Sequence, residues 1–483
     1  MSGMAYDVVV VGSGPNGLAA AILLQQQGLD VLIVEAKDTI GGGMRSAELT
    51  LPGFLHDVCS AVHPMAAVSP FFSALPLQEY GLSFINPPIL AAHPFDDGSA
   101  AVLLSSMIET ALGFGVDRQQ YMHLFKPFVD QWPNMVDDLL GPIGFPKAPF
   151  LVARFGLKAL LPAQVFAKQF KTTKLRGLWA GMAAHSMLPF NQWATAAIAM
   201  VLIINGHLKG WPIVQGGTQH LANALANYFL SIGGEIETKA YITSLGQLPQ
   251  AKAIIFDTSV KQLLQIAGHQ FSPIYQAQLR RYRPGTGLFK IDWALNEAIP
   301  FTAPACREAG TIHIGNTLEE VAQAEKEVAM GKHPEKPFVL LAQQSLFDAS
   351  RAPRGKHVAY AYCHVPNGST VNMVRHIEDQ VERFAPGFKD CILARHTLDN
   401  RALENYNPNY HGGDVNGGSL NISQLFTRPA LRFSPYRTSA KGLYICSAAT
   451  PPGGGVHGMG GYHAAKRVLK DIFHLDIANK KEI

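Results

Sequence analysis

Cysteine is scarce in this sequence, and its few copies are poorly placed for paired chemistry. The five cysteines among 483 residues are odd in number, scattered, and form no Cys-x-x-Cys pair. This usage fits reduced thiols in a cytoplasm and excludes a redox-active dithiol of the disulfide reductase type. The 18 histidines include no His-Glu-x-x-His motif and no cluster with cysteine, so we expect no metal site.

Charged residues are also few. They make up 16% of the chain, against 47% hydrophobic residues, which excludes long disordered segments. The low charge leaves room for apolar surface patches or an apolar pocket. The formal net charge of +4 favours anionic surfaces slightly and does not indicate a nucleic-acid partner. Nothing in the pattern specifies an oligomeric state.

Hydrophobic runs of membrane-spanning length are absent. The most apolar region, residues 177–206, is broken by His185 and by Pro189-Phe-Asn-Gln192. Neither half is therefore expected to span a bilayer, and buried helices are predicted instead. A strand is predicted within a few residues of Met1, which leaves no room for a secretory or transit segment. We therefore expect a cytoplasmic protein.

The most informative motif lies near the N-terminus. An apolar run ends in Gly12-Ser-Gly-Pro-Asn-Gly17 and continues into a helix-forming stretch, and a second apolar run ends on Glu35. Strand, glycine turn, helix, strand and acid in this order are typical of adenine dinucleotide binding. Gly12 permits the tight turn, Gly14 lets a pyrophosphate approach the backbone, and Gly17 lets the helix pack closely. Glu35 can accept hydrogen bonds from ribose hydroxyls, and its charge disfavours NADP.

Later segments of the chain are predicted to belong to the same nucleotide-binding domain. A second glycine cluster, Gly41-Gly-Gly43, follows Glu35. Short strands are predicted over residues 233–237, 240–243, 252–257 and 442–446, and a final helix over residues 462–473.

The predicted architecture is α/β. A discontinuous Rossmann-type domain with a parallel sheet is expected over residues 1–75, 210–270 and 425–483. An α+β substrate domain is inserted in two pieces, residues 76–209, which look mainly helical, and residues 271–424.

With these motifs the chain resembles flavin-dependent members of the phytoene desaturase and amine oxidase superfamily. It is most similar to the branch with carotenoid desaturases and isomerases, retinol saturase and the pyridine nucleotide-disulfide oxidoreductase domain-containing protein 2 group. Three blocks carry the resemblance, namely 12–18, 35–64 and 443–459. Shorter matches lie between them, so the resemblance covers nearly the whole chain without being specific to one substrate.

The resemblance implies FAD bound in an extended form. The first turn would meet the pyrophosphate, Glu35 the adenosine ribose, and the C-terminal glycine run the isoalloxazine ring. The implied cofactor-binding residues are Gly12, Ser13, Gly14, Pro15, Asn16, Gly17, Glu35, Ala36, Gly42, Gly43, Met44, Ile242, Ala448, Ala449, Gly455, Val456, His457, Gly458 and Met459.

The chain departs from the superfamily's pattern at two positions. Amine oxidases usually have Gly-Gly-Arg where this chain has Gly41-Gly-Gly43. The arginine that neutralises phosphate is therefore missing or is supplied by Arg45. The C-terminal motif has Ser447-Ala448 in place of Gly-Asp or Gly-Glu, which favours the carotenoid branch over amine oxidases.

The sequence does not identify a catalytic residue, but it offers three candidates. His63, which follows the second glycine cluster with Asp57 and Ser60, could edge the pocket, and His457 lies inside the C-terminal glycine run. Asp292 is a third candidate, although alternation along a strand places it on the same face as Lys290, where a structural ion pair is the default.

The resemblance implies hydride transfer between the flavin and a carbon of an apolar, polyene- or lipid-like substrate. An amine or amino-acid oxidase of the same fold and a non-catalytic flavin-binding interaction protein are the alternatives. Residues 156–176 place lysines among apolar residues. This pattern is typical of a solvated helix face, and docking onto an anionic membrane is the second interpretation.

Overall fold

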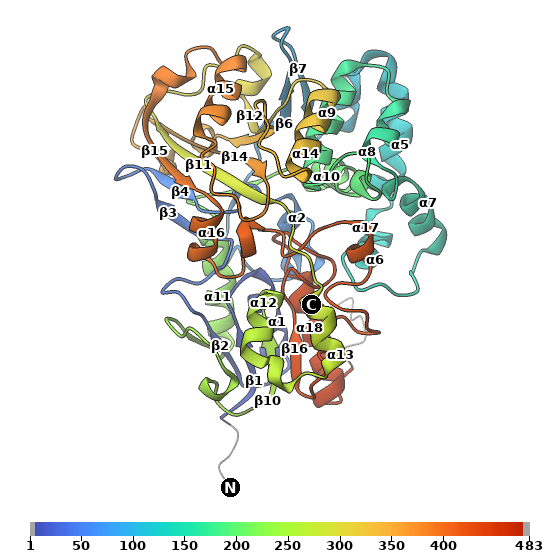
Figure 1. The fold of residues 1–483 in the computed structure, drawn as a ribbon, viewed down its shortest axis with the longest axis vertical. Helices are drawn as coiled ribbons and strands as arrows, with labels where there is room; N and C mark the ends of the chain where they lie inside the picture. The colour runs from blue at the N-terminus through green and yellow to red at the C-terminus, as the bar shows by residue number, and fades with distance from the viewer. Residues whose placement is uncertain (1–4, 477–483) are drawn as a thin grey trace.

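In the computed structural model, which describes residues 5–476, the chain folds around two sheets (Figure 1). The lower sheet has five parallel strands in the order β16-β10-β1-β2-β9. These strands are β1 (Tyr6–Val11), β2 (Val31–Val34), β9 (Glu235–Glu237), β10 (Ala251–Phe256) and β16 (Leu443–Ile445). The predicted α/β class with a parallel sheet is therefore confirmed. The domain boundaries themselves stay predictions.

Strand β1 is apolar throughout its inner part because both faces of this sheet are covered. Val8 and Val10 face a core shared with helices α1 (Pro15–Gln25), α11 (Gln219–Ser231) and α18 (Met459–Ile472). Val9 and Val11 face the opposite side, where α12 (Val260–Ala267) and α13 (Pro273–Arg280) pack.

The contact between α1 and α18 is very close. A Cβ atom on Gly461 would lie 1.8 Å from the Asn16 carbonyl oxygen, so no larger residue fits there without moving one helix. The two helices hold the first and last motifs of the chain together.

The upper sheet has seven strands in the order β15-β11-β14-β13-β12-β6-β7. All neighbours are antiparallel except β12 and β6. Helix α15 (Val374–Phe384) packs on the face of Trp293, and α9 (Thr173–Ala184) and α14 (Leu318–Ala329) lie on the other side. The strands are β6 (Ile89–Pro94), β7 (Ala100–Leu103), β11 (Gly287–Leu295), β12 (Ala309–Ile314), β13 (Val339–Ala342), β14 (His357–Val365) and β15 (Ile392–Leu398).

Helices fill the side of the molecule next to this sheet (Figure 1). They are α4 (Met107–Leu112), α5 (Arg118–Asp130), α6 (Val136–Leu139), α7 (Pro149–Ala159), α8 (Ala163–Phe166), α9 (Thr173–Ala184) and α10 (Thr195–Lys209). Shorter elements connect the two halves: β3 (Ser46–Glu48), β4 (Leu55–Asp57), α2 (Pro64–Ala67), α3 (Pro70–Ser73), β5 (Phe84–Ile85), β8 (Ile213–Val214), α16 (Asn400–Tyr406) and α17 (Ile422–Leu425).

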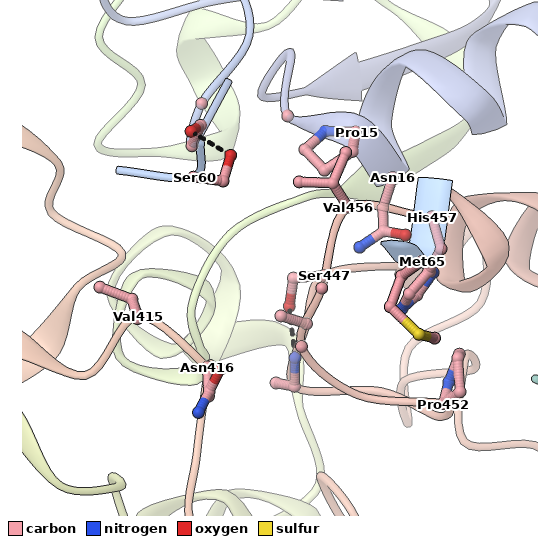
Figure 2. A pocket seen from close by; sticks show the side chains of 18 of the residues that line it. Pro15, Asn16, Ser60, Met65, Val415, Asn416, Ser447, Pro452, Val456 and His457 are labelled. Atoms are coloured by element: carbon pink, nitrogen blue, oxygen red, sulfur yellow. Dashed lines mark hydrogen bonds between the residues drawn. The ribbon is translucent and has the colours of Figure 1, made fainter. Parts of the chain in front are cut away.

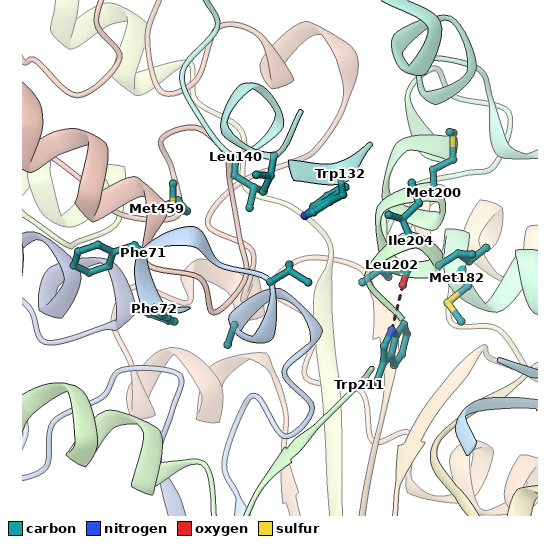
Figure 3. Packing of buried hydrophobic residues seen from close by; sticks show 14 of the residues in the cluster. Phe71, Phe72, Trp132, Leu140, Met182, Met200, Leu202, Ile204, Trp211 and Met459 are labelled. Carbon is teal, nitrogen blue, oxygen red and sulfur yellow. Dashed lines mark hydrogen bonds between the residues drawn. The ribbon is translucent and has the colours of Figure 1, made fainter. Parts of the chain in front are cut away.

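The apolar region 177–206 forms the buried helices α9 and α10, as predicted. Figure 3 shows Met182, Met200 and Ile204 packed in this core beside Trp211, whose indole N–H donates to the Leu202 carbonyl. Within residues 5–476, no single helix has the length and apolar composition to cross a membrane, and α7 with the helical segment Ala163–Gln169 passes that test only as a pair bent by 96°.

Three details differ from the sequence prediction. Residues 240–243 are not a strand: after β9 the chain leaves the sheet, and the Lys239 and Ala240 N–H groups donate to the Lys37 and Glu35 carbonyls. The segment 76–209 contributes strands β5, β6 and β7 as well as helices. The last helix begins at Met459 rather than Tyr462, because its glycines pack directly on α1.

Candidate active site

One large cavity of about 860 Å³ runs between the two sheets, a size typical of cofactor and substrate sites. We call it the central cavity. Its walls come from the first glycine turn, the second glycine cluster, the C-terminal glycine run and the inner face of the upper sheet. In Figure 2, Pro15 and Asn16 at the start of α1 lie beside Val456 and His457. The first and last sequence motifs therefore share one site.

The first glycine turn has the geometry expected of a nucleotide cradle. Gly12 has a φ of 104°, which a residue with a side chain rarely adopts. A Cβ on Gly17 would lie 2.1 Å from the Gly12 carbonyl oxygen, so Gly17 allows the close packing that the sequence predicted. A Cβ on Gly42 would lie 3.0 Å from Gly14 Cα. The two glycine clusters therefore meet backbone to backbone along the cavity.

Asp257, at the end of β10, was not predicted to take part in the site. Its carboxylate accepts a hydrogen bond of 2.9 Å from the Gly17 N–H, which therefore is not free to meet a phosphate as expected. Burial raises the pKa of Asp257 to about 7, against the opposing effect of that hydrogen bond. The sequence signal for such a role is an acid directly after a buried strand.

Glu35 lies at the end of β2 and lines the cavity. Its carboxylate accepts hydrogen bonds from the Ser13 N–H (3.1 Å), the Ser13 hydroxyl (2.5 Å) and the Lys37 N–H (2.9 Å). Arg45 Nη2 donates to the same carboxylate at 3.1 Å. Arg45 therefore serves as the partner of Glu35, and the turn around Ser13 is tied to the acid that the ribose was expected to meet.

The predicted cofactor residues divide into two groups. Gly12, Ser13, Gly14, Pro15, Asn16, Glu35, Ala36, Gly42, Gly43, Ile242, Ala448, Ala449, Gly455, Val456 and His457 line the central cavity. Gly17, Met44, Gly458 and Met459 do not: Met44 is fully buried, and Gly458 and Met459 form the N-cap and first residue of α18. Ile242 lines the cavity from an irregular segment rather than from a strand.

Arg428 is a second residue that the sequence did not reveal. Its guanidinium is 2% exposed, and no carboxylate of the described residues lies within ion-pair distance of it. Nη2 donates to the carbonyls of Ala448 (2.8 Å) and Gly417 (3.3 Å), and Nε donates to that of Ala449 (3.4 Å). Nη1 has no partner. A buried cation thus stands directly behind three residues of the cavity wall, and the buried Asp414 is close enough for the charge of Arg428 to oppose the rise in its pKa that burial causes.

The histidine candidates lie at the cavity but are uncharged at neutral pH. His63 Nε2 is 3.0 Å from the Thr218 hydroxyl, and His457 Nδ1 accepts from the Met459 N–H at 3.0 Å. Burial lowers the pKa of both imidazoles to about 4. Neither is therefore a proton donor in the imidazolium form above about pH 5.

Asp292 does not line the cavity. It forms a buried ion pair with Lys290 at 2.5 Å, the structural pairing that strand alternation predicted. Burial raises the pKa of Asp292, but Lys290, His396 and His56 together outweigh that effect and lower the pKa below its usual value. Asp57 also lies behind the wall, where it accepts from Arg351 and Thr218, whereas Ser60 does line the cavity.

The upper end of the cavity is apolar. Leu288, Leu340, Tyr360 and Tyr362 line it from the upper sheet. The helical wall consists of Val152, Phe155, Ala159, Leu160, Ala194, Ala197, Ile198, Val201 and Leu202. Within residues 5–476, no group of three His, Cys, Asp or Glu side chains is arranged to hold a metal ion.

Comparisons with known proteins agree with this geometry. A family model of an NAD(P)-binding Rossmann-like domain matches residues 10–75. Pyridine nucleotide-disulfide oxidoreductase domain-containing protein 2 of Mus musculus is 25% identical, over 97% of this chain and 94% of the relative. Phytoene desaturase (lycopene-forming) of Pseudescherichia vulneris is 25% identical, over 93% and 96% of the two chains.

Solved structures show the same fold. A variant of putrescine oxidase superposes with a TM-score of 0.63 over 97% of this chain and 99% of its own, at 15% sequence identity. The resemblance inferred from the three motifs is thus confirmed over nearly the full length. The chain is therefore an oxidoreductase with a Rossmann-type α/β fold, and it resembles proteins of the phytoene desaturase-like family over nearly its full length.

Proposed function

We propose that this protein binds FAD along the central cavity and uses it to transfer hydride to or from carbon in an apolar substrate. One observation supports this most strongly. A single cavity runs from Glu35, past the first glycine turn and the C-terminal glycine run, to a chamber with apolar walls. This shape suits an extended dinucleotide whose reactive end meets a water-poor substrate site.

The chain's own groups fit the parts of FAD. Glu35 would accept from the ribose hydroxyls, as in other dinucleotide sites. The N–H of Asn16 at the start of α1 would bind the pyrophosphate, since a helix start favours anions. The buried Arg428 would supply positive charge behind Ala448 and Ala449. A bound flavin supplies the ability to accept or return a hydride.

The residues around the reactive end hold and shield the substrate more than they exchange protons. His63 and His457 are neutral, and the upper walls are aliphatic and aromatic. Such a chamber suits a polyene- or lipid-like molecule, because burying apolar surface drives its binding. The name of the phytoene desaturase relative supports the same class.

An amine oxidase is the second candidate. The rings of Tyr360 and Tyr362 both line the cavity, with centroids 6.2 Å apart and planes tilted by 45°, and aromatic pairs of this kind attract ammonium groups. The purified protein, reconstituted with FAD, should separate the two functions. Flavin bleaching by isoprenoid lipids, without peroxide release from an amine panel, supports the first; the reverse supports the second.

We further propose that the protein works at the cytoplasmic surface of a membrane. Phe145, Phe150 and Leu157 are 91%, 91% and 78% exposed. Phe145 lines the cavity, and Phe150 and Leu157 lie on α7, which lines it through other residues. We call this part of the cavity wall its rim. Arg154 and Lys158 share helix α7 with Phe150 and Leu157, and Phe145 precedes that helix. Apolar residues flanked by cations are suited to an anionic lipid surface. The five free thiols support a reducing compartment.

A further inference from the structure

One wall of the apolar chamber contains a small group of polar side chains. His185 and Ser186 follow the end of α9, and Thr311 and His313 lie two residues apart on the facing strand β12. His185, Ser186 and Thr311 line the central cavity, together with Trp211. We call His185, Ser186, Thr311 and His313 the polar corner.

Three atoms of the polar corner have no hydrogen-bond partner. They are the hydroxyl oxygens of Ser186 and Thr311 and Nδ1 of His313. The residues are 2%, 1% and 0% exposed, respectively, so bulk water does not satisfy them. Because buried polar atoms are nearly always bonded in native proteins, the two unpartnered hydroxyls that line the cavity, those of Ser186 and Thr311, indicate a missing ligand group.

The two imidazoles are a built feature of the packing. His185 Nε2 and His313 Nε2 are 2.9 Å apart, so one donates to the other. Trp211 meets both rings edge to face, at centroid distances of 5.9 Å. A Cβ on Gly181 of α9 would lie 2.6 Å from His313 Nδ1. The helix therefore makes room for this imidazole by carrying no side chain where it crosses the strand.

The polar corner is also uncharged. Burial lowers the pKa of His185 to about 3 and that of His313 well below its usual value. The charged residues that line the cavity are Glu35, Lys37, Arg45, Asp138 and Asp257. None of them lies on α9, α10 or the upper sheet. A carboxylate or an ammonium at this wall would lack a counter-charge, whereas a neutral hydroxyl or carbonyl would not need one.

We propose that the polar corner binds the neutral oxygen group, hydroxyl or carbonyl, of an otherwise apolar substrate. This inference rests on the proposed function, which supplies the apolar substrate. The hydroxyls of Ser186 and Thr311 can each donate or accept, so they suit either group. With one end held there, the hydrocarbon chain along the α10 wall is fixed in register, and the carbon that reacts is selected by its distance from the oxygen.

Binding of matched ligands tests this proposal without relying on turnover. The ligands are an isoprenoid hydrocarbon and the primary alcohol, aldehyde and carboxylic acid of the same chain length. Each is titrated into the FAD-reconstituted protein, following the flavin absorption band, and into the apoprotein, by displacement of a lipophilic fluorophore. We expect the alcohol and aldehyde to bind about tenfold tighter than the hydrocarbon or the acid.

The variant Ser186→Ala with Thr311→Val should remove this preference and leave hydrocarbon affinity unchanged. Thr258→Val is the matched control: its hydroxyl is also buried, unpartnered and at the cavity, but on the nucleotide side. It should keep the preference. Equal binding of alcohol and hydrocarbon, tightest binding of the acid, or a preference that survives the double substitution would each overturn the proposal.

The same measurements separate a failure of the polar corner from a failure of FAD binding. If the protein takes up FAD and reacts with hydrocarbons but shows no preference for oxygen, the polar corner is wrong and the proposed function stands. If no FAD binds while the apoprotein still prefers the alcohol, the proposed function is wrong and the polar corner stands.

Discussion

The carboxylate of Asp257 accepts a hydrogen bond of 2.9 Å from the Gly17 N–H, at the start of the helix that should bind a pyrophosphate. This contact places an acid with a pKa raised to about 7 beside the place where two further negative charges are expected. The carboxylate lies close to the backbone of the glycine turn, since a Cβ on Gly14 would lie 2.5 Å from it. The protonation state of Asp257 should therefore govern both cofactor affinity and stability.

FAD affinity should decrease as the pH rises through about 7. Below that value Asp257 is neutral and does not repel the pyrophosphate; above it the carboxylate must take up a proton for FAD to bind. The dissociation constant, measured by flavin fluorescence quenching, should rise by up to about tenfold per pH unit on the alkaline side. Asp257→Asn should make it independent of pH. A pH profile that is the same in both proteins would show that Asp257 does not control binding.

The same shift predicts an effect on stability. The folded pKa of Asp257 is above its ordinary value of 3.8, so the folded state holds a proton that the unfolded chain releases between those pH values. The stabilisation is complete below about pH 4 and is lost as the pH rises through about 7. Asp257→Asn should therefore melt at a higher temperature than the natural protein at pH 8, with a smaller difference at pH 4, by differential scanning fluorimetry of the apoprotein.

Arg428 should contribute to FAD binding through its charge. Arg428→Gln removes the buried cation and should weaken FAD affinity by about tenfold or more, because the phosphates lose a counter-charge in a medium of low dielectric constant. Arg428→Lys keeps the charge and should recover part of the loss. Arg437→Gln, at a half-exposed ion pair with Asp471, is the control and should bind FAD normally. Equal losses in the Gln and Lys variants would assign Arg428 a purely structural role.

Gly461 should not tolerate a side chain. Gly461→Ala places a methyl group 1.8 Å from the Asn16 carbonyl and forces α1 and α18 apart. We expect a loss of about 1–3 kcal/mol in the free energy of unfolding, measured by urea denaturation. Gly246→Ala is the control, since nothing lies within 4 Å of its added Cβ. Unchanged stability in Gly461→Ala would show that the two helices are not held as closely as described.

The rim of the cavity should bind lipid. Phe145→Ser with Phe150→Ser should lower the partitioning onto vesicles containing anionic lipid by about tenfold, because two large apolar side chains no longer enter the interface. Sedimentation with vesicles measures the bound fraction. Ile274→Ser, which changes a residue that is 75% exposed on α13 and outside the cavity lining, should have no effect. If the natural protein does not bind vesicles, the proposed membrane contact is wrong.

The sequence predicted the parts of the fold and site that depend on local order. Gly12, Gly17 and Glu35 are close in the chain, and one strand–turn–helix–strand unit determines their geometry. The final motif was found for the same reason, because a buried strand runs into a glycine-rich turn. Strands β6 and β7 were missed because Ile-Leu-Ala-Ala-His-Pro is short, rich in alanine and ends in proline, and its strand pairing depends on β12, about 220 residues away.

The contacts that define the site's chemistry join distant segments and leave little trace in the sequence. Asp257 reaches Gly17 across 240 residues, and Arg428 reaches Tyr282 across 146. The hydrogen bond between His185 and His313 exists only because α9 crosses the upper sheet. Periodicity and motif spacing carry no information on such crossings, so the role of these residues could be identified only from the structure.

The most direct test of the central claim is the visible absorption spectrum of the purified protein after incubation with FAD and removal of the excess. We expect an oxidised flavin spectrum, with FAD released on denaturation in a molar amount equal to that of the protein. A colourless protein that retains no FAD at pH 6, where Asp257 is protonated, would contradict this claim.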